Sequence, residues 1–489
     1  MNLPTLTLPA ERGRELVAFR HLYVHIPFCK HKCGYCDFNA YAGMDRMMPD
    51  YIDALERELV FARERYPFQQ LDTVYLGGGT PSLLPAPLAS RLLDFIRVNF
   101  NVAPDAEITL EANPASTDQE RAAAWRDGGV NRLSLGVQGF DPRALAVLER
   151  KTDAAQATRA FQLAREMGFA NISIDLIYAV PYQSLETWLE TLRRAIALGP
   201  DHVSTYCLSF EEGTLLFRRR SEGRVPEVGS DLQWDQLDAA CEVLERAGYH
   251  RYEVSNWARG GGFESRHNQA YWRCRPVYGA GAGAHSYATD GDLAWRWWNV
   301  ARPREYVAAA PRVRADGEEL DHRKALAESL MLGLRTESGV SAPAGFDVEL
   351  ARLQKAGLVR RVQAGCCRRA EASTFTTRSP SPSFERRISF RAALISTDAE
   401  AQRAHDSAGG RGRFARARGR GVRGRAGGHA HLGPSGGLPA AGGRRPPMQP
   451  RLLRVAGGSL QAQRAGREQG RPQQRRQGRL LHETLTSLL

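Results

Sequence analysis

Three cysteines, Cys29, Cys33 and Cys36, follow a short apolar stretch at residues 22–26 with the spacing C-x3-C-x2-C. Three thiolates this close together can bind one cubane iron–sulfur cluster. A cluster ligated only by protein takes four cysteines, so one iron would have no protein ligand. The spacing therefore predicts a 4Fe–4S cluster in which one iron is left open to a small molecule.

Two other uses of these cysteines stay open. A structural zinc site takes four ligands, often as two C-x2-C pairs, and no second pair exists here, so His31 would have to be the fourth ligand. A disulfide framework would leave one of the three cysteines unpaired.

The composition indicates an intracellular, soluble class of protein. A chain of 489 residues has room for two or three domains, and its eight cysteines are too few for a disulfide scaffold. No apolar run reaches the roughly 20 residues of a membrane span. The expected leader, residues 1–20, carries Glu11, Arg12, Arg14 and Glu15, which argues against a signal peptide. We expect a cytoplasmic protein with at most transient membrane contact.

The net charge of +13 belongs to the end of the chain. Residues 366–489 contain 24 arginines, no lysine and seven acidic residues, a net +17, so residues 1–365 carry −4. This segment, rich in Arg, Gly, Ala and Pro, has three interpretations: disorder, a reading frame lost in a GC-rich gene, or a nucleic-acid arm. Because basic arms normally use lysine as well, no nucleic-acid partner is expected.

Strands and helices alternate through the first part of the chain, which predicts an α/β protein with a parallel sheet. Strands are predicted at 22–26, 71–76, 107–110, 132–137, 171–177 and 202–208, and helices at 49–65, 85–100, 117–126, 142–150, 154–167 and 185–198. An open doubly wound sheet and a full or partial barrel both fit. Polar residues gather after the carboxyl ends of the strands, where barrels place their active sites.

Two polar features within this pattern suggest a binding site. Residues 77–81, Gly-Gly-Gly-Thr-Pro, follow a strand, and successive glycine N–H groups make an anion-binding nest, although such a turn is weak evidence alone. Asp175 lies inside an apolar strand, where a carboxylate is costly unless it is paired or hydrogen-bonded.

The cysteine loop resembles that of the radical S-adenosylmethionine (SAM) family, in which an aromatic residue, here Tyr35, precedes the last cysteine. The runs H-I-P-F-C and Y-C-D-F resemble the branch that contains the oxygen-independent coproporphyrinogen III oxidases and the HemW haem chaperones. The resemblance implies a partial (β/α)6 TIM-like barrel over residues 21–210. It also implies a smaller, mainly helical C-terminal domain over residues 211–365.

The resemblance also implies a set of SAM-binding residues in addition to the cluster cysteines. Family members usually place a histidine just after the arginine of this set, but this chain has Lys151 there. The residues implied are Tyr23, Gly78, Gly79, Thr80, Glu111, Gln138, Arg150 and Asp175.

Residues 267–272 read His-Asn-Gln-Ala-Tyr-Trp, which resembles a stretch associated with haem in HemW. The resemblance implies that His267 binds haem, with Tyr271 and Trp272 packing against the macrocycle, since imidazole is an ordinary haem ligand. A histidine beside two aromatic residues is more often simply packed. His25, His31 and His285 are further candidates.

Phe38 stands where the oxidases carry a fourth cysteine, and the chain reaches its first cysteine early, at residue 29. Both features favour a haem chaperone that delivers haem to respiratory haem proteins. The alternative is a radical SAM oxidative decarboxylase of porphyrin biosynthesis. An electron donor such as flavodoxin or ferredoxin is expected in either case, and whether SAM is cleaved stays open.

Overall fold

The computed structural model of the chain describes residues 15–343, 345–356, 358–363 and 373–377. The expected leader at residues 1–20 lies largely outside these ranges, and its last two residues, Phe19 and Arg20, already belong to the first strand. Most of the expected tail at residues 366–489 also lies outside the described residues. Its residues 373–377 form a strand, described below.

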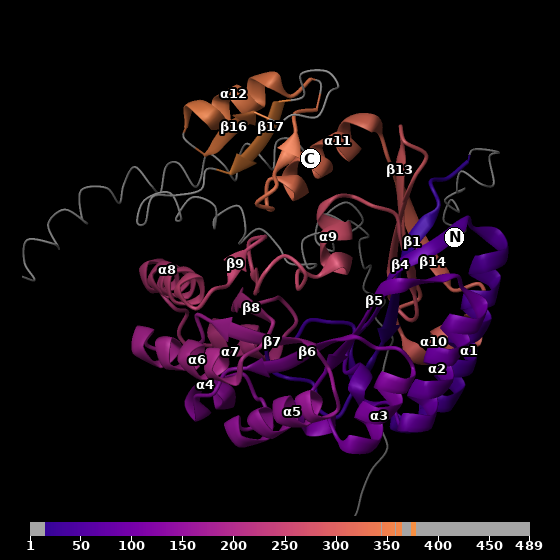
Figure 1. Ribbon diagram of the computed structural model, residues 1–489, viewed down its shortest axis with the longest axis horizontal. Helices are drawn as coiled ribbons and strands as arrows, with labels where there is room; N and C mark the ends of the chain where they lie inside the picture. Colours follow the sequence, from indigo (N-terminus) through magenta and orange to yellow (C-terminus); the bar gives the residue numbers. More distant parts are fainter. Residues whose placement is uncertain (1–14, 344, 357, 364–372, 378–489) are drawn as a thin grey trace, which may run out of the picture.

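Six parallel strands form the centre of the molecule, with helices packed around them (Figure 1). In sheet order the strands are β1 (Phe19–Ile26), β4 (Phe68–Gly78), β5 (Val102–Ala112), β6 (Arg132–Gln138), β7 (Asn171–Tyr178) and β8 (His202–Cys207). The helices between them are α1 (Met48–Arg65), α2 (Ala86–Asn99), α3 (Gln119–Asp127), α4 (Pro142–Val147), α5 (Ala154–Glu166) and α6 (Leu185–Leu198). This arrangement confirms the predicted partial (β/α)6 barrel.

Local sequence signals explain where these helices begin and end. Asp118, Asp153 and Ser184 each accept a hydrogen bond from the backbone N–H three residues on, which satisfies donors at the start of α3, α5 and α6. Gly199 ends α6 with a φ of 73°, a conformation that glycine adopts without steric cost. The predicted order of strands and helices is confirmed over this part, and most boundaries agree to within about three residues, whereas β5 is longer than the predicted strand at 107–110.

Residues 211–320 differ from the mainly helical segment expected after residue 210, because six further strands extend the main sheet. Its order within the described residues is β14-β13-β12-β11-β1-β4-β5-β6-β7-β8-β10-β9. These strands are short and rich in aromatic residues and glycine, so they give little periodic signal. The added strands are β9 (His250–Arg251), β10 (Asn256–Ala258), β11 (Val277–Ala280), β12 (His285–Thr289), β13 (Ala294–Asn299) and β14 (Arg314–Leu320).

The remaining helices of this part are α7 (Leu215–Ser221), α8 (Ser230–Arg246), α9 (Arg266–Trp272) and α10 (Pro303–Ala309). Short 3-10 helices are η2 (Asp45–Met47), η3 (Pro81–Leu83) and η4 (Pro114–Ser116). No helix among the described residues combines the length and the apolarity needed to cross a membrane.

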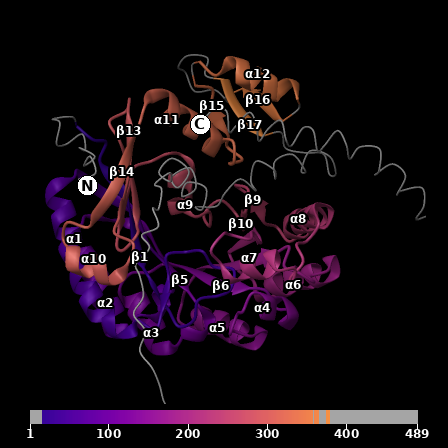
Figure 2. The same cartoon turned by 180° about the vertical axis from the view of Figure 1, so that it is seen from behind.

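A small unit with its own core follows the main sheet. It contains α11 (His322–Gly333), α12 (Asp347–Lys355) and a sheet in the order β15 (Val340–Ser341), β17 (Ser373–Thr377), β16 (Val359–Gln363). Leu330, Phe346 and Leu353 are buried in this core. Figure 2 shows the unit from behind, set apart from the barrel and joined to it through α11. We propose that the folding units divide near residue 321, where the main sheet ends.

The interior of the barrel is polar because residues alternate along each strand. Leu22, Val24 and Ile26 of β1 are fully buried in the hydrophobic core. The residues between these apolar ones point to the other face of the sheet, and on neighbouring strands they lie side by side. His21 is the register partner of Thr73, and Thr73 that of Glu107. Alternation of this kind follows from the strand geometry, in which successive side chains point to opposite faces.

A buried carboxylate on α1 ties the added strands to the barrel. Glu58 is 0% exposed, and its Oε1 accepts from Asn299 Nδ2 at 2.7 Å while its Oε2 accepts from Gly281 N at 2.9 Å. The hydroxyls of Tyr278 and Tyr306 donate to the same group. All four donors are neutral, and burial raises the pKa of Glu58 to about 7.

Candidate cofactor site

The cysteine loop is fixed at the carboxyl end of β1. Cys29 ends the short strand β2 (Phe28–Cys29), which pairs with β3 (Tyr41–Ala42), and its Sγ lies 3.4 Å from Thr80 Oγ1. Asn39 Nδ2 donates to the carbonyls of Ala282 and Ala301, both at 2.9 Å. The added strands therefore help to hold the loop that carries the three thiols.

The glycine-rich turn after β4 packs directly under this loop. Gly78 has a φ of 112°, and a Cβ there would lie 2.6 Å from the His25 imidazole, so only glycine fits. Gly79 N donates to Ile26 O at 2.9 Å. Gly78 N donates to Glu111 Oε2 at 3.1 Å, which brings the predicted Glu111 to the same turn.

Arg150 and Gln138 approach the loop from β6 and the segment after α4. Arg150 Nη1 lies 3.7 Å from Cys33 Sγ, and its Nη2 donates to Gly136 O. Its Nε is buried without a hydrogen-bond partner in the described part of the chain. Gln138 ends β6 with a φ of 68°, and its Nε2 lies against Gly136 as well. Arg150 thus offers an unused donor and a positive charge beside the thiols.

Asp175 lies deeper in the barrel than these groups. Its carboxylate accepts from the hydroxyls of Ser134, Ser173 and Ser204 at 2.8–3.1 Å. Burial raises the pKa of Asp175, and the three hydroxyls and Arg132 oppose that rise. The hydrogen bonds that the sequence analysis required for a carboxylate in an apolar strand are therefore present.

Tyr23, at the middle of β1, lies between the carboxyl and amino ends of the barrel. Its hydroxyl is 3.0 Å from His25 Nδ1, whose Nε2 lies 2.9 Å from Asn39 O, so both nitrogens of His25 are in contacts. The Tyr23 ring stacks on Tyr75 at a centroid distance of 6.0 Å, and Tyr75 OH donates to Glu111 Oε1 at 2.8 Å.

The predicted haem residues lie at the other end of the barrel, on α9. Thr73, in the middle of β4, contacts His267, whereas the cysteine loop follows the carboxyl end of β1, roughly 15 Å along the strands. His267 is 1% exposed, its ring stacks on Tyr75 at 5.0 Å, and burial lowers its pKa to about 3. The structure therefore brings most of the predicted SAM residues close to the cysteines. His267 lies away from the cysteines, but its ring stacks on Tyr23 at a centroid distance of 6.4 Å, so Tyr23 joins the two groups of residues.

The neighbours of His267 differ in exposure. Tyr271 is 39% exposed and packs edge-on against His267 at 5.2 Å. Trp272 is half-buried, with the Arg335 guanidinium 5.0 Å above its ring. Arg335 follows α11, which belongs to the small unit, so Trp272 connects α9 to that unit. His285 packs against Trp298, and His31 lies 4.0 Å from Glu149.

Several interior residues were missed by sequence reasoning. Glu107 accepts from the backbone N–H groups of Arg266 and His267, which satisfies the start of α9. His202 lies 2.8 Å from both Ser173 Oγ and Tyr252 OH. The signal was a polar residue at every second strand position, which becomes informative only once the interior face is known.

These residues fit a cluster with one open iron. A cubane cluster would take each thiolate on a separate iron, so the three cysteines of the loop would hold three of its four irons. Burial raises the pKa of Cys29, and the charges of Lys32 and Arg150 oppose that rise. Cations near the loop favour the thiolates that iron ligation needs.

Comparison with known proteins agrees with this geometry. Residues 23–195 match the radical SAM superfamily. A protein from Mycobacterium tuberculosis named heme chaperone HemW is 40% identical over 325 residues, which cover 65% of this chain and 82% of that protein. The chain belongs to the HemW family. The Escherichia coli HemW is 39% identical over 295 residues, covering 58% of this chain and 75% of its own.

A solved structure extends the HemW comparison to the fold. Coproporphyrinogen III oxidase (HemN) from Escherichia coli, described as a radical SAM enzyme, matches with a TM-score of 0.62 and 25% identity. The match covers 73% of this chain and 86% of the oxidase. Membership of the superfamily implies a 4Fe–4S cluster and SAM. When bound, these groups supply one-electron cleavage chemistry, and the chain's residues orient them.

Proposed function

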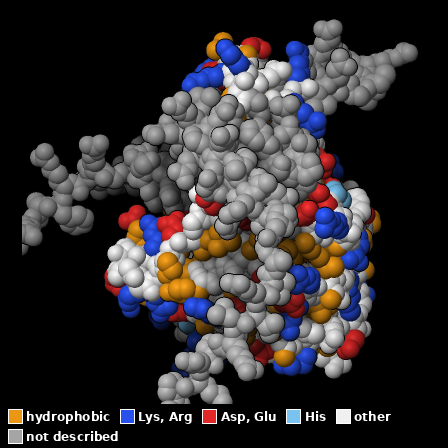
Figure 3. Space-filling model, turned by 90° about the vertical axis from the view of Figure 1, so that its left-hand side faces the viewer, with side chains coloured by type: hydrophobic (Ala, Val, Ile, Leu, Met, Phe, Trp, Pro, Cys, Tyr) orange, Lys and Arg blue, Asp and Glu red, His pale blue; other side chains and the backbone are white. Residues whose placement is uncertain are grey.

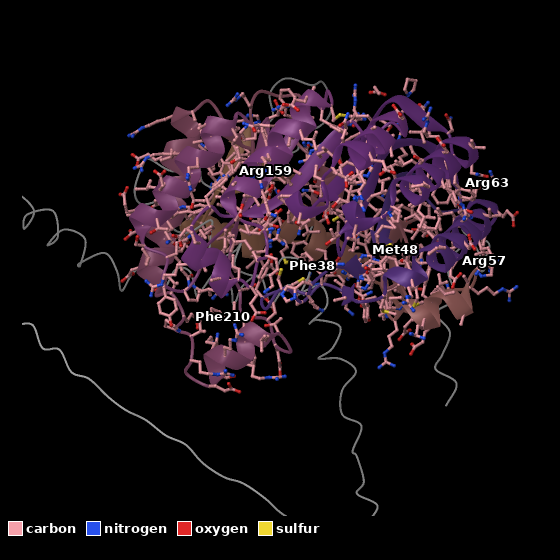
Figure 4. The ribbon with its side chains drawn as sticks, turned by 90° about the horizontal axis from the view of Figure 1, so that it is seen from below. Phe38, Met48, Arg57, Arg63, Arg159 and Phe210 are labelled. Atoms are coloured by element: carbon pink, nitrogen blue, oxygen red, sulfur yellow. The ribbon has the colours of Figure 1, made fainter. Side chains whose placement is uncertain are left out.

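We propose that this chain is a haem chaperone, which binds a 4Fe–4S cluster, SAM and haem and passes haem to acceptor proteins. The observation that carries the proposal is its 39–40% identity to proteins named heme chaperone HemW, over at least three quarters of their length. Phe38 supports it, because this 53% exposed side chain stands where the oxidases have a further cysteine (Figure 4).

The second candidate is an oxygen-independent coproporphyrinogen III oxidase, favoured by the structural match to HemN. The two functions are separated by incubating the anaerobically prepared protein with coproporphyrinogen III, SAM and a reductant. No protoporphyrinogen IX is expected. Formation of that product at many turnovers per chain would contradict the chaperone function and assign the oxidase function instead.

For SAM, we propose a site between the glycine-rich turn and Arg150. The Arg150 guanidinium would meet the SAM carboxylate, and backbone carbonyls around Gly78, Gly79 and Thr80 would accept from the amino group. Glu111 and Asp175 would accept from amine or ribose hydroxyls, Gln138 would donate, and Tyr23 would pack beneath the nucleoside. The unpartnered Nε of Arg150 supports this assignment.

Replacing Arg150 with methionine is expected to weaken SAM binding about 10- to 100-fold, because a charge-assisted hydrogen bond contributes roughly 1.5–3 kcal/mol. Calorimetric titration of cluster-loaded protein with SAM measures the change. Arg150→Lys is the matched control, since it keeps the charge without the planar fork and should lose less. Equal affinities for the native protein and the methionine variant, at equal iron content, would remove Arg150 from the site.

For haem, we propose that His267 supplies a nitrogen ligand and that Tyr271 and Trp272 flank the macrocycle. His267 Nε2 is buried and has no hydrogen-bond partner in the described part of the chain, so its bonding capacity is unused. Because His267 is 1% exposed, haem reaches this nitrogen only when α9 or Tyr271 moves. The exposed ring of Tyr271 marks the side from which haem would enter.

His267→Ala is expected to abolish stoichiometric haem binding, with a loss of more than about 100-fold in affinity, because an iron–imidazole bond disappears. Titration with haem followed by visible absorbance measures this. His322→Ala serves as the control, since His322 is exposed at the start of α11 beside the carbonyl of Asp292 and is not a haem candidate. Unchanged haem affinity in the His267 variant would contradict this ligand assignment.

Two protein partners complete the proposal. Exposed Lys30 and Lys32 beside the cysteine loop support an electron donor with an acidic surface, of the flavodoxin or ferredoxin type. Haem-requiring respiratory proteins are the proposed acceptors. Figure 3 shows a band of hydrophobic side chains across the middle of one face, and such bands are typical of protein contact surfaces.

A further inference from the structure

Thr73, in the middle of β4, lies between two histidines, one from β1 and one from α9. Its Oγ1 is 3.0 Å from His21 Nδ1 and 2.7 Å from His267 Nδ1. His21 is the register partner of Thr73 on β1, whereas His267 comes from α9. Thr73 and His267 are buried, and His21 is partly exposed. One hydroxyl therefore joins two imidazoles from different parts of the chain.

The number of hydrogens in this contact limits the histidine tautomers. A neutral imidazole carries one N–H, and a charged His267 would place a second N–H on its buried Nε2, which has no hydrogen-bond partner among the described residues. Two hydrogen bonds at Thr73 need two hydrogens, and the hydroxyl supplies only one. At least one histidine must therefore donate from Nδ1, which leaves its Nε2 with a free lone pair.

The surroundings decide which histidine donates. His267 Nε2 is buried and has no hydrogen-bond partner among the described residues. A proton on that nitrogen would make an orphaned buried N–H, which costs about 1–3 kcal/mol and is rare in native structures. His21 is partly exposed, so an N–H at its Nε2 can reach water. The His267 proton therefore belongs on Nδ1.

We propose that Thr73 is a positioning residue that holds His267 in the tautomer with an unprotonated Nε2. Thr73 accepts from His267 Nδ1 and donates its own proton to His21 Nδ1. Histidines that bind metals are commonly fixed in this way through their other nitrogen. The stack on Tyr75 and the edge contact with Tyr271 fix the plane of the same ring. The consequence for haem rests on the proposed function.

The first test reads the tautomer without haem. In nitrogen-15 spectra of the full-length, haem-free protein, the His267 signal is assigned by its loss in His267→Ala. It is expected to show the Nδ1–H pattern in the native protein and in Thr73→Ser, which keeps the hydroxyl. Thr73→Val keeps the shape and removes the hydroxyl, so the pattern should change. An Nε2–H pattern in the native protein, or no change in the valine variant, would overturn the proposal.

The second test measures haem affinity in the same variants. Thr73→Val should bind haem about 10- to 100-fold more weakly, the usual cost of losing a partner behind a metal ligand. Thr73→Ser should restore most of the affinity. Native affinity in Thr73→Val would contradict the positioning role. Suppose that the spectra show the Nδ1–H pattern but His267→Ala still binds haem. This result would support the hydrogen bond between Thr73 and His267, and it would overturn the role of that hydrogen bond in haem binding.

Discussion

Replacing Cys33 with alanine is expected to abolish the iron–sulfur cluster. In the predicted cluster each thiolate of the loop would hold a separate iron, and the loop carries no fourth cysteine that could replace Cys33. Anaerobically reconstituted native protein should bind about four iron atoms and absorb broadly in the visible range. The alanine variant should lose both the iron and the colour.

The control for this experiment is Cys207→Ala, which removes a half-buried cysteine at the end of β8, outside the loop. This variant should keep its full iron content. Circular dichroism of both variants checks that the barrel folds. Retention of four irons by Cys33→Ala, or tight binding of one zinc ion by the native loop, would refute the cluster and every function built on it.

Replacing Glu58 with alanine is expected to destabilise the fold by about 3 kcal/mol near pH 6. The change removes the acceptor of Gly281 N and of the Tyr278 and Tyr306 hydroxyls, and it opens a cavity between α1 and the added strands. Glu58→Gln keeps an acceptor oxygen and the volume, so it should cost less. Denaturant unfolding followed by circular dichroism measures both, and an alanine variant within about 0.5 kcal/mol of native would contradict this role.

The Glu58 carboxyl should also make stability depend on pH. Its pKa is about 7 in the folded chain against 4.5 as its ordinary value, so the folded state holds this proton more tightly. The contribution of this proton to the free energy of unfolding is complete below pH 4.5. It is lost as the pH rises through 7, which lowers the free energy of unfolding by about 3 kcal/mol.

The buried histidines titrate in part of this window with the opposite sign, because burial lowers the pKa of His21 and His267. Subtracting the unfolding free energy of Glu58→Gln from that of the native protein removes the contribution of the histidines, because both proteins contain them. This difference in unfolding free energy should fall steadily between pH 5 and pH 7. A difference that stays flat over that interval would show that Glu58 titrates as an ordinary carboxyl.

The close agreement over residues 22–208 has a local cause. Apolar residues at helical spacing on α1, α2 and α6 and the caps Asp118 and Asp153 act within a few residues of each other, so they are readable in the sequence. The strands β9–β14 were missed because they are short and depend on partners far along the chain: β11 pairs with β1, more than 200 residues before it. Register between such segments is a tertiary property.

By itself, the sequence determined the spacing of the three cysteines, from which we predict the cluster ligands, and also the glycine-rich turn and the order of strands and helices over residues 22–208, because spacing and periodicity are local. Only the tertiary structure decided that Arg150 lies beside Cys33 and that Thr73 joins His21 to His267. It also decided that Glu58 is buried among neutral donors. These contacts join residues from 52 to 241 positions apart, and their geometry exists only when the barrel closes around its polar interior.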